Sequence, residues 1–311
     1  MAKFSEPKIN LTSGLLLLVL GILWGGSFFF AEIALSEVPP LTVALHRVFW
    51  AMPVLFIVVM WKGIGIPKSM RAWLCYFVMG ALNNAIPFSL IFWGQTHIGS
   101  GLASILYSTT AFFGVIVAGI FLVDERLTVW KIIGALFGVF GVATIMGLDA
   151  LTNFDLSRLA QLAILGAALS FALAGVWSKW FLSEYPSVMN ALGMLVASTV
   201  IMFPIAVITE GIPILALSTE VWASLMAIAI LSTAIASFLY FKILALAGAA
   251  NLMLVALLIP PIGVGLSVAF LDEKMGMGAG LGFGLITMGL LITDGRLMGR
   301  LRRKPNQADD P

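Results

Sequence analysis

The chain has 311 residues, of which 61% are hydrophobic and 10% are charged, whereas about 25% of the residues in an ordinary soluble domain are charged. This composition excludes a soluble globular protein and predicts a polytopic membrane protein, and the net charge of +2 gives no reason to expect a nucleic-acid partner. One cysteine (Cys75) and two histidines (His46 and His97) exclude an intramolecular disulfide and argue against a metal site, and we expect no cofactor.

Charged and turn-forming residues divide the sequence into ten apolar segments. Each is close to the roughly 20 residues that a membrane-spanning helix requires, and the first is too long for the core of a signal peptide. The sequence therefore predicts an all-α membrane protein with ten transmembrane helices. We expect these helices, in chain order, near Leu11–Leu35, Pro40–Trp61, Arg71–Trp93, Gly99–Leu122, Thr128–Leu148, Arg158–Leu182, Ser187–Ile208, Val221–Leu244, Gly248–Leu271 and Gly276–Thr293.

One short motif occurs twice in the chain. The segment Phe121–Leu127 ends an apolar run, turns with two acidic residues and one basic residue, and leads into a Gly-rich run. The segment Phe270–Met275 repeats this pattern, with Asp272 placed 148 residues after Asp124. Repetition at one offset indicates a duplicated structural unit. Matches at offsets of 147 and 149 residues also pair Leu35–Pro39 with Leu182–Pro186, Trp73 with Trp222, and Phe92 with Phe241.

The duplication predicts two halves, residues 1–148 with five helices and residues 149–311 with five helices and a basic tail. Because five is an odd number, the second half must lie in the membrane upside down relative to the first. Transporters built from such inverted repeats hold their substrate near the middle of the membrane, between the two halves. This organisation is the first indication of function.

The basic residues define the expected orientation. With the N-terminus placed inside the cell, 14 of the 17 Lys and Arg residues fall on the inner side, and Arg47, Arg158 and Lys274 fall on the outer side. Cytoplasmic loops normally show this bias. We therefore expect a multi-pass protein of the cell (inner) membrane with both termini in the cytoplasm, and we interpret the tail Arg300–Lys304 as a topology anchor.

These features resemble the drug/metabolite transporter superfamily, and most closely its EamA branch of bacterial metabolite exporters. The resemblance lies in the ten spans and two repeats, in the segment Trp24–Ser27 of the first helix, in Arg47, and in the Phe-Leu-x-Asp/Glu-Glu endings of the fourth and ninth helices. It covers essentially the whole chain and implies export of small metabolites, often amino acids, by alternating access. One departure is that the family often has a proline in the middle of the fourth helix, where this chain has Thr109–Phe113. The ninth helix keeps the proline, as Pro260 and Pro261.

Two polar pairs fall near the middle of corresponding helices. Asn83 and Asn84 lie in the third helix, and Ser232 and Thr233 lie at the equivalent positions of the eighth. Polar groups in hydrocarbon are costly unless they find partners. One interpretation is a polar patch of the substrate cavity, close to the axis that relates the two halves. The other is hydrogen bonding between helices, which Asn, Ser and Thr often provide.

His46 and Arg47, early in the second predicted helix, are the most informative charged residues of the sequence. Only 14 residues separate Arg47 from Lys62, or about 21 Å of helix, which is too short to cross about 30 Å of hydrocarbon, so the helix must begin earlier, near Leu41. Both side chains must therefore lie below the outer end of the helix. They line the outward cavity in one interpretation, with His46 able to titrate; in the other, Arg47 extends to the outer interface.

Aromatic residues supply the remaining candidates for a substrate site. Trp24 and Tyr107 lie deep in their helices, and Trp24 stands beside Gly25, where the backbone can bend or approach a neighbour. Trp177 lies nearer a helix end, where an aromatic belt at the membrane interface is the alternative. No carboxylate lies near the centre of a predicted helix, although proton and sodium sites usually need one. Transport is therefore either downhill or coupled to protonation of His46.

We therefore expect a transporter that exports small metabolites, in particular amino acids with aromatic or apolar side chains. The alternative is a multidrug or toxic-compound efflux protein of the same fold, which would need a buried acid as the partner of a cation. An enzyme is not expected, because the chain has no catalytic motif. The partners are then the small-molecule substrate and the lipid bilayer. Glycines in the fifth and tenth helices favour tight packing or a homodimer contact, and a monomer is equally compatible.

Overall fold

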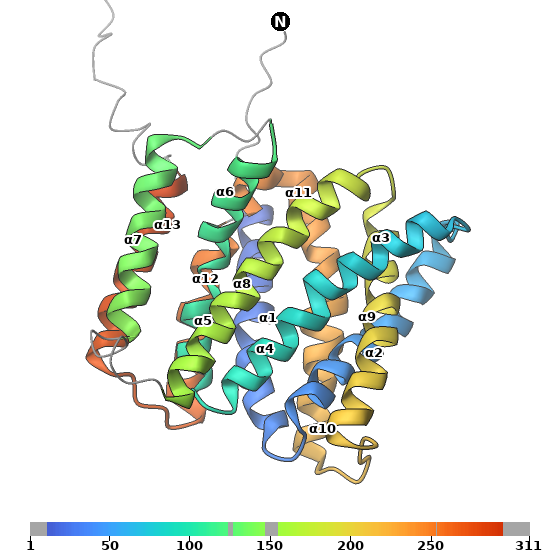
Figure 1. Cartoon of the computed structure of the whole chain (residues 1–311), viewed down its shortest axis with the longest axis horizontal. Helices are drawn as coiled ribbons and strands as arrows, with labels where there is room; N and C mark the ends of the chain where they lie inside the picture. The colour runs from blue at the N-terminus through green and yellow to red at the C-terminus, as the bar shows by residue number, and fades with distance from the viewer. Residues whose placement is uncertain (1–10, 124–126, 147–154, 253, 295–311) are drawn as a thin grey trace, which may run out of the picture.

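The structure is a computed structural model that describes residues 11–123, 127–146, 155–252 and 254–294. These residues form a bundle of helices and no strand (Figure 1). The acidic pair Asp124 and Glu125 of the first motif and the basic tail Arg300–Lys304 lie outside the described residues. The helices are α1 (Leu11–Leu35), α2 (Pro40–Trp61), α3 (Met70–Gly80), α4 (Ile86–Gln95), α5 (Ser100–Tyr107), α6 (Thr110–Phe121), α7 (Val129–Met146), α8 (Leu156–Phe181), α9 (Ser187–Glu210), α10 (Thr219–Met226), α11 (Ala236–Leu252), α12 (Val255–Phe270) and α13 (Met277–Asp294), with π-helices η1 (Ala81–Ala85) and η3 (Ala227–Ile235).

Eight of the described helical stretches are long and apolar enough to cross a membrane. The chain is therefore a multi-pass membrane protein. Helix α12 and helix α13 are also apolar but shorter. Large apolar side chains on the outside of the bundle, such as Val139, Phe140 and Leu281, are more than half exposed in the absence of lipid, as expected for surfaces that face hydrocarbon.

The third, eighth and ninth predicted helices differ from the observed ones. The third and eighth contain the π-helices η1 and η3 instead of continuous α-helix. In the third, the ring of Pro87 is incompatible with the α-helical hydrogen bond to Asn83 four residues earlier. The ninth begins at Val255 rather than at Gly248, because the Ala-rich end of α11 continues as helix through Leu252.

The fourth predicted helix is interrupted between α5 and α6. The hydroxyls of Ser108, Thr109 and Thr110 each donate to the carbonyl oxygen three residues earlier, at 2.6 Å. Such bonds compete with the helical pattern. The interruption falls at Thr109–Phe113, where the resemblance noted from the sequence leads us to expect a proline, so hydroxyl residues interrupt the helix here without one.

Helices α7 and α13 pack closely along one side of the bundle (Figure 1). A Cβ atom on Gly134 would lie 2.5 Å from the Gly289 oxygen, and one on Gly141 would lie 2.8 Å from the Gly282 oxygen. The residue numbers rise along one helix as they fall along the other, so the two helices are antiparallel. The glycines therefore provide tight packing within the chain, which is one of the two roles expected for them.

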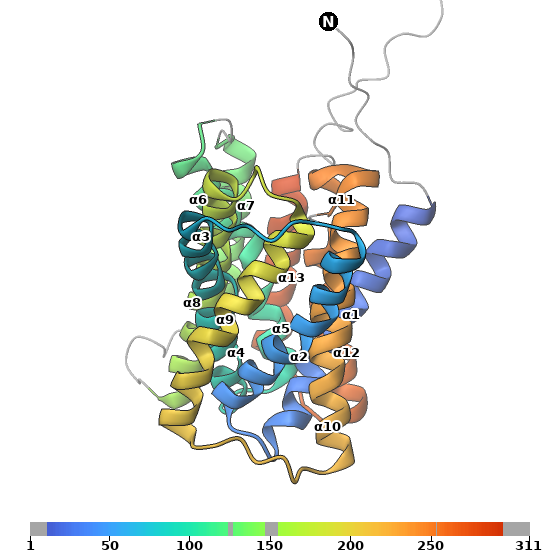
Figure 2. The same cartoon turned by 90° about the vertical axis from the view of Figure 1, so that its right-hand side faces the viewer.

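The two halves pack in corresponding ways. The contact between α1 and α12 in one half-to-half interface corresponds to the contact between α8 and α6. In the same way, the contact of α4 with α8 corresponds to the contact of η3 and α11 with α1. Helix α2 lies between α9 and the α10–η3 segment (Figure 2). Helix α1 runs from the upper to the lower end of Figure 1, whereas α8 runs from the lower to the upper end. The largest buried cluster lies in the middle, where both halves contribute side chains.

Candidate substrate-binding site

Both π-helices carry the polar pairs that the sequence places at equivalent positions. Asn83 and Asn84 lie in η1, and Ser232 and Thr233 lie in η3. A π-helix widens the turn and redirects side chains, and it is frequent at functional sites. Asn84, Ser232 and Thr233 are buried. The positions of these residues were predictable from the sequence, but the π-helical backbone that orients their side chains was not.

The Asn pair faces α9. The Asn84 side-chain amide donates to the Ser198 hydroxyl at 2.8 Å, and the Asn83 amide lies 3.5 Å from the sulfur of Met194. Further toward the upper end, the Tyr76 hydroxyl donates to the Asn190 side chain at 3.1 Å. These hydrogen bonds join helices of the first half to α9 of the second half, which is the second of the two interpretations given for the Asn pair.

The Ser232 and Thr233 pair faces α1 and α2 instead. The Ser232 hydroxyl donates to the Leu23 carbonyl oxygen at 2.6 Å, and the Thr233 hydroxyl accepts from Arg47 Nε at 3.1 Å. Among the described residues no hydrogen bond joins this pair to the Asn pair. The structure thus places the two pairs on separate interfaces between the halves.

His46 and Arg47 lie inside the bundle, with 6% and 8% of their surface exposed. The burial of Arg47 does not fit an extension to the outer membrane interface. His46 Nδ1 accepts from Trp50 Nε1 at 2.9 Å, and the ring meets Trp222 edge to face at 5.6 Å. Its Nε2 is buried and has no hydrogen-bond partner among the described residues.

A row of aromatic rings begins at Arg47. The Arg47 guanidinium carbon lies 4.0 Å from the centre of the Phe88 ring, an attractive cation–π arrangement. Phe88 meets Phe171 at 6.0 Å, Phe171 meets Tyr107 at 5.6 Å, and Tyr107 meets Phe28 at 5.4 Å, all edge to face. Tyr107 thus joins Arg47 through rings from both halves.

The two tryptophans proposed from the sequence lie elsewhere. Trp24 packs against Tyr240, with ring centres 6.0 Å apart. Trp177 donates from Nε1 to the Cys75 carbonyl oxygen at 3.1 Å and packs on Phe181. Neither indole has a ring contact with the row that begins at Arg47. Tyr107 is thus part of the row that begins at Arg47, whereas Trp24 and Trp177 lie outside it; His46 precedes Arg47 in α2 and contacts Trp50 and Trp222.

Carboxylates at the lower end bind the starts of helices from the other half. Glu210 accepts from the backbone N–H groups of Leu41 and Thr42 at 2.9 and 2.8 Å, and from the Thr42 hydroxyl at 2.8 Å. Glu273 accepts from Ser100 N and Oγ at 2.8 Å and from Gly101 N at 3.1 Å. Helix starts carry free N–H groups and a partial positive charge, which favour carboxylates.

A third carboxylate, Glu37, completes this set, since it accepts from the Ser218 backbone N–H at 2.9 Å where α10 begins. Hydrogen bonds from the Ser218 hydroxyl and backbone hold the pKa of Glu37 below its usual range. The contact is therefore present at neutral pH and is lost as the pH falls through that lowered pKa. Sequence reasoning identified Glu273 in a repeated motif but missed these caps, because each partner lies in the opposite half.

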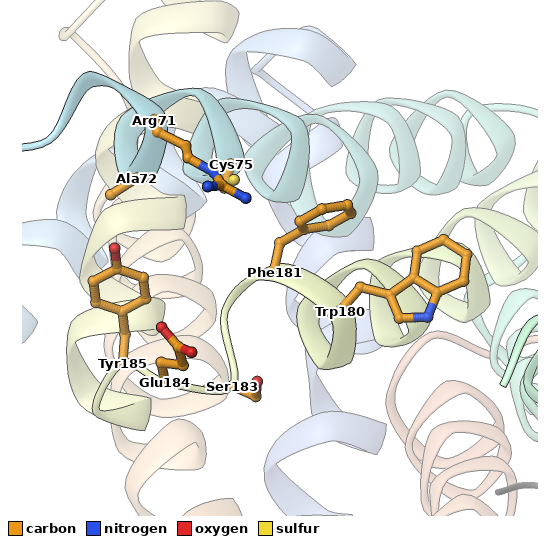
Figure 3. Close-up of a pocket in the computed structure, with 8 residues that line it drawn as sticks. All are labelled: Arg71, Ala72, Cys75, Trp180, Phe181, Ser183, Glu184 and Tyr185. Atoms are coloured by element: carbon orange, nitrogen blue, oxygen red, sulfur yellow. The ribbon is translucent and has the colours of Figure 1, made fainter. Parts of the chain in front are cut away.

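The upper end holds an open pocket of about 260 Å³ (Figure 3). Arg71 and Cys75 on α3 face Glu184 and Tyr185 of the α8–α9 connection across it. Glu184 is the counterpart of Glu37, at the offset of 147 residues. Ser69, the counterpart of Ser218, begins α3 without a side-chain cap, and Glu184 has no hydrogen bond among the described residues. The contact that closes the lower end is therefore absent at the upper end.

Comparison with known proteins decides what kind of bundle this is. The model of the EamA-like transporter family matches residues 12–147 and, a second time, residues 158–293. This chain belongs to the EamA-like transporter family. The membership confirms the resemblance inferred from the repeated motifs, and it assigns the buried polar centre of this EamA-like protein to a membrane transporter.

Relatives of this EamA-like protein align over most of its length. An uncharacterized transporter, YoaV, of Bacillus subtilis is 26% identical over 87% of this chain and 92% of its own. A probable amino-acid metabolite efflux pump of Escherichia coli is 27% identical over 90% and 93%. A probable terminal-alkyne amino-acid exporter of Streptantibioticus cattleyicolor is 25% identical over 90% and 93%. A crystal structure with 18% identity shares the fold, with a TM-score of 0.67 over 94% of this chain and 100% of the other.

Proposed function

We propose that this EamA-like transporter exports amino acids, including aromatic and apolar ones, by alternating access between two inverted five-helix repeats. The repeats are residues 1–148 and 149–311, and α12 and α13 complete ten spans. The glycine contacts support this arrangement. Gly134 and Gly282 are counterparts 148 residues apart, and so are Gly141 and Gly289. Gly134 contacts Gly289, and Gly141 contacts Gly282, so each contact is the counterpart of the other. A two-fold axis in the membrane plane produces such reciprocal pairs.

The difference between the two ends carries the proposal of alternating access. At the lower end, Glu37, Glu210 and Glu273 bind helix starts across the boundary between the halves. At the upper end, the equivalent contact of Glu184 is missing and a pocket is present. In the other state we expect Glu184 to bind the start of α3 and the lower contacts to open. Two states of this kind give the solute access to one side at a time.

Basic side chains support an orientation with the upper end in the cytoplasm of the cell inner membrane. Most Lys and Arg residues among those described lie at the upper ends of helices or in upper loops, as cytoplasmic segments usually do. Both termini then lie in the cytoplasm, and the described state is open to the inside. The upper-end residues are Lys62, Lys68, Arg71, Lys131 and Lys179.

The amino-acid assignment is supported by the relatives whose names refer to amino-acid export, and by the amide, hydroxyl and aromatic lining. A decisive experiment measures the flux of labelled amino acids into liposomes that contain the purified protein. The expected result is saturable flux of aromatic and apolar amino acids. Absence of flux for a broad panel, with a correctly folded protein, would contradict the proposal.

The proposed substrate-binding residues give a first mutational prediction. Trp24→Ala and Asn84→Leu are expected to lower the flux strongly with normal expression, because the first removes the indole that packs against Tyr240 and the second removes the amide that bonds Ser198. Flux in liposomes and size-exclusion profiles check this. Trp61→Ala, at a tryptophan that is 84% exposed, is a suitable control. Wild-type flux in both variants would contradict the assignment of these two residues to the substrate site.

Proton coupling through His46 gives a second prediction. Trp50 Nε1 can only donate, so His46 Nδ1 must accept and the neutral ring carries its hydrogen on Nε2. Protonation would place a hydrogen on Nδ1 and break the Trp50 bond. Flux is therefore expected to vary between pH 5 and 8 and to become flat in His46→Gln. In His97→Gln the pH dependence should remain. A flat wild-type profile would exclude coupling through His46.

A further inference from the structure

Arg47 carries the strongest unexplained feature of the central region, a buried positive charge with no counter-ion. The side chain of Arg47 is buried, with 8% of the residue's surface exposed. Its Nε donates a hydrogen bond to the Thr233 hydroxyl. No other hydrogen bond of its side chain is formed with a described residue, and no carboxylate of the described chain lies within ion-pair distance. An arginine has five N–H donors, so four are left without an acceptor. An unpaired charge in a membrane interior is costly and usually marks a functional site.

A purely structural role does not account for this charge. The counterpart of Arg47 in the second half is Met194, at the offset of 147 residues. Met194 packs on η1 as Arg47 packs on η3, and its sulfur lies 3.5 Å from the amide of Asn83, the residue before Asn84, which is the counterpart of Thr233. The same helix pairing is thus formed with an uncharged side chain in the other half. What differs is a guanidinium presented to the centre of the bundle.

We infer that the guanidinium of Arg47 binds the carboxylate of the transported solute, while the solute's apolar body lies along the Phe88–Phe171–Tyr107–Phe28 row. The planar fork of an arginine matches the two oxygens of a carboxylate and forms charge-assisted hydrogen bonds. Phe88 and Thr233 hold the guanidinium from one face and one edge, so its terminal nitrogens are already oriented. The inference rests on the proposed function and assigns its specificity to one group.

The neighbouring groups fit the same solute. His46 precedes Arg47 in α2, and its buried Nε2–H has no hydrogen-bond partner among the described residues, so this turn of α2 holds a second buried donor without an acceptor. The aromatic rings provide a surface for apolar or aromatic side chains, with the edge-to-face spacing at which rings attract one another. A carboxylate joined to an apolar body therefore offers acceptor oxygens to the terminal N–H groups of Arg47 and an apolar surface to the rings.

The test compares four probes on the purified full-length protein in lipid nanodiscs. They are L-phenylalanine, L-phenylalaninamide, phenethylamine and 3-phenylpropanoate, with affinity measured from the ligand-dependent shift in thermal denaturation. Loss of a hydrogen-bonded ion contact weakens binding about tenfold to a hundredfold. We expect the two carboxylates to bind at least about tenfold more tightly than the amide and the amine. Equal affinity of L-phenylalanine and its amide would overturn the inference.

Variants at one position sharpen the result. Arg47→Met reproduces the side chain of the second half, and it should abolish the preference for the carboxylates. Arg47→Lys should keep part of it, because a lysine pairs as a point charge without the fork. Lys242→Met, which removes an exposed charge, should change nothing. A folded Arg47→Met that keeps the preference would also overturn the inference.

Failure of this inference differs from failure of the proposed function. If L-phenylalanine is transported but its amide is transported equally well, the exporter assignment stands and Arg47 does not recognise the carboxylate. If no amino acid is bound or transported but 3-phenylpropanoate binds in an Arg47-dependent way, the carboxylate site stands and the amino-acid assignment falls.

Discussion

Gly282→Leu is expected to prevent close packing of α7 on α13 and to lower the midpoint of thermal denaturation by about 5 °C. A Cβ atom on Gly282 would lie 2.5 Å from both the Gly141 oxygen and a side-chain carbon of Ile145. The first of these is backbone, which cannot move aside as a side-chain tip can. Overpacking of this kind costs about 1–3 kcal/mol or more, and about 3 kcal/mol corresponds to that shift in a protein of this size.

The matched control lies two residues further along the same helix. Gly284 is exposed, and a Cβ atom there would have no neighbour within 4 Å. Gly284→Leu should therefore denature at the wild-type temperature, since it adds an apolar side chain to a lipid-facing surface. Thermal denaturation in detergent, followed by size-exclusion chromatography, measures both variants. Equal stability of the two would show that α7 and α13 are not in contact as described.

Glu273→Gln is expected to shift the protein away from the state that is open at the upper end. The carboxylate accepts bonds from two backbone N–H groups, one on each oxygen. A glutamine has one acceptor oxygen, so at least one of these bonds is lost and an NH₂ group faces a donor. A hydrogen bond to a charged group contributes about 1.5–3 kcal/mol, so the ratio of the two states should change about tenfold or more.

Cys75 reports this shift, because it lines the upper pocket and is the one cysteine of the chain (Figure 3). An uncharged maleimide should label it quickly in the wild type and several-fold more slowly in Glu273→Gln. Glu220→Gln removes an exposed acid at the same end of the bundle and should leave the rate unchanged. An unaltered labelling rate in a folded Glu273→Gln variant would mean that the lower contacts do not control the pocket.

The sequence by itself determined the class of protein, most helix positions and the repeat. These are local properties. A run of about 20 apolar residues favours a membrane helix wherever it lies, and the offset from Asp124 to Asp272 can be read without coordinates. It also placed Asn84 and Thr233 in the middle of their helices, and Tyr107 deep in another.

The tertiary structure alone decided which of these residues meet. The bond from Arg47 to Thr233 joins positions 186 residues apart, and that from Thr42 to Glu210 joins positions 168 apart. Partners so distant leave no periodic pattern in the chain, and the helix starts that Glu210 and Glu273 bind offer backbone N–H groups, which every sequence contains. Hydrophobicity fixes where a helix crosses the membrane because it acts on each segment separately, whereas the pairing of a buried charge depends on the packing of all the helices around it.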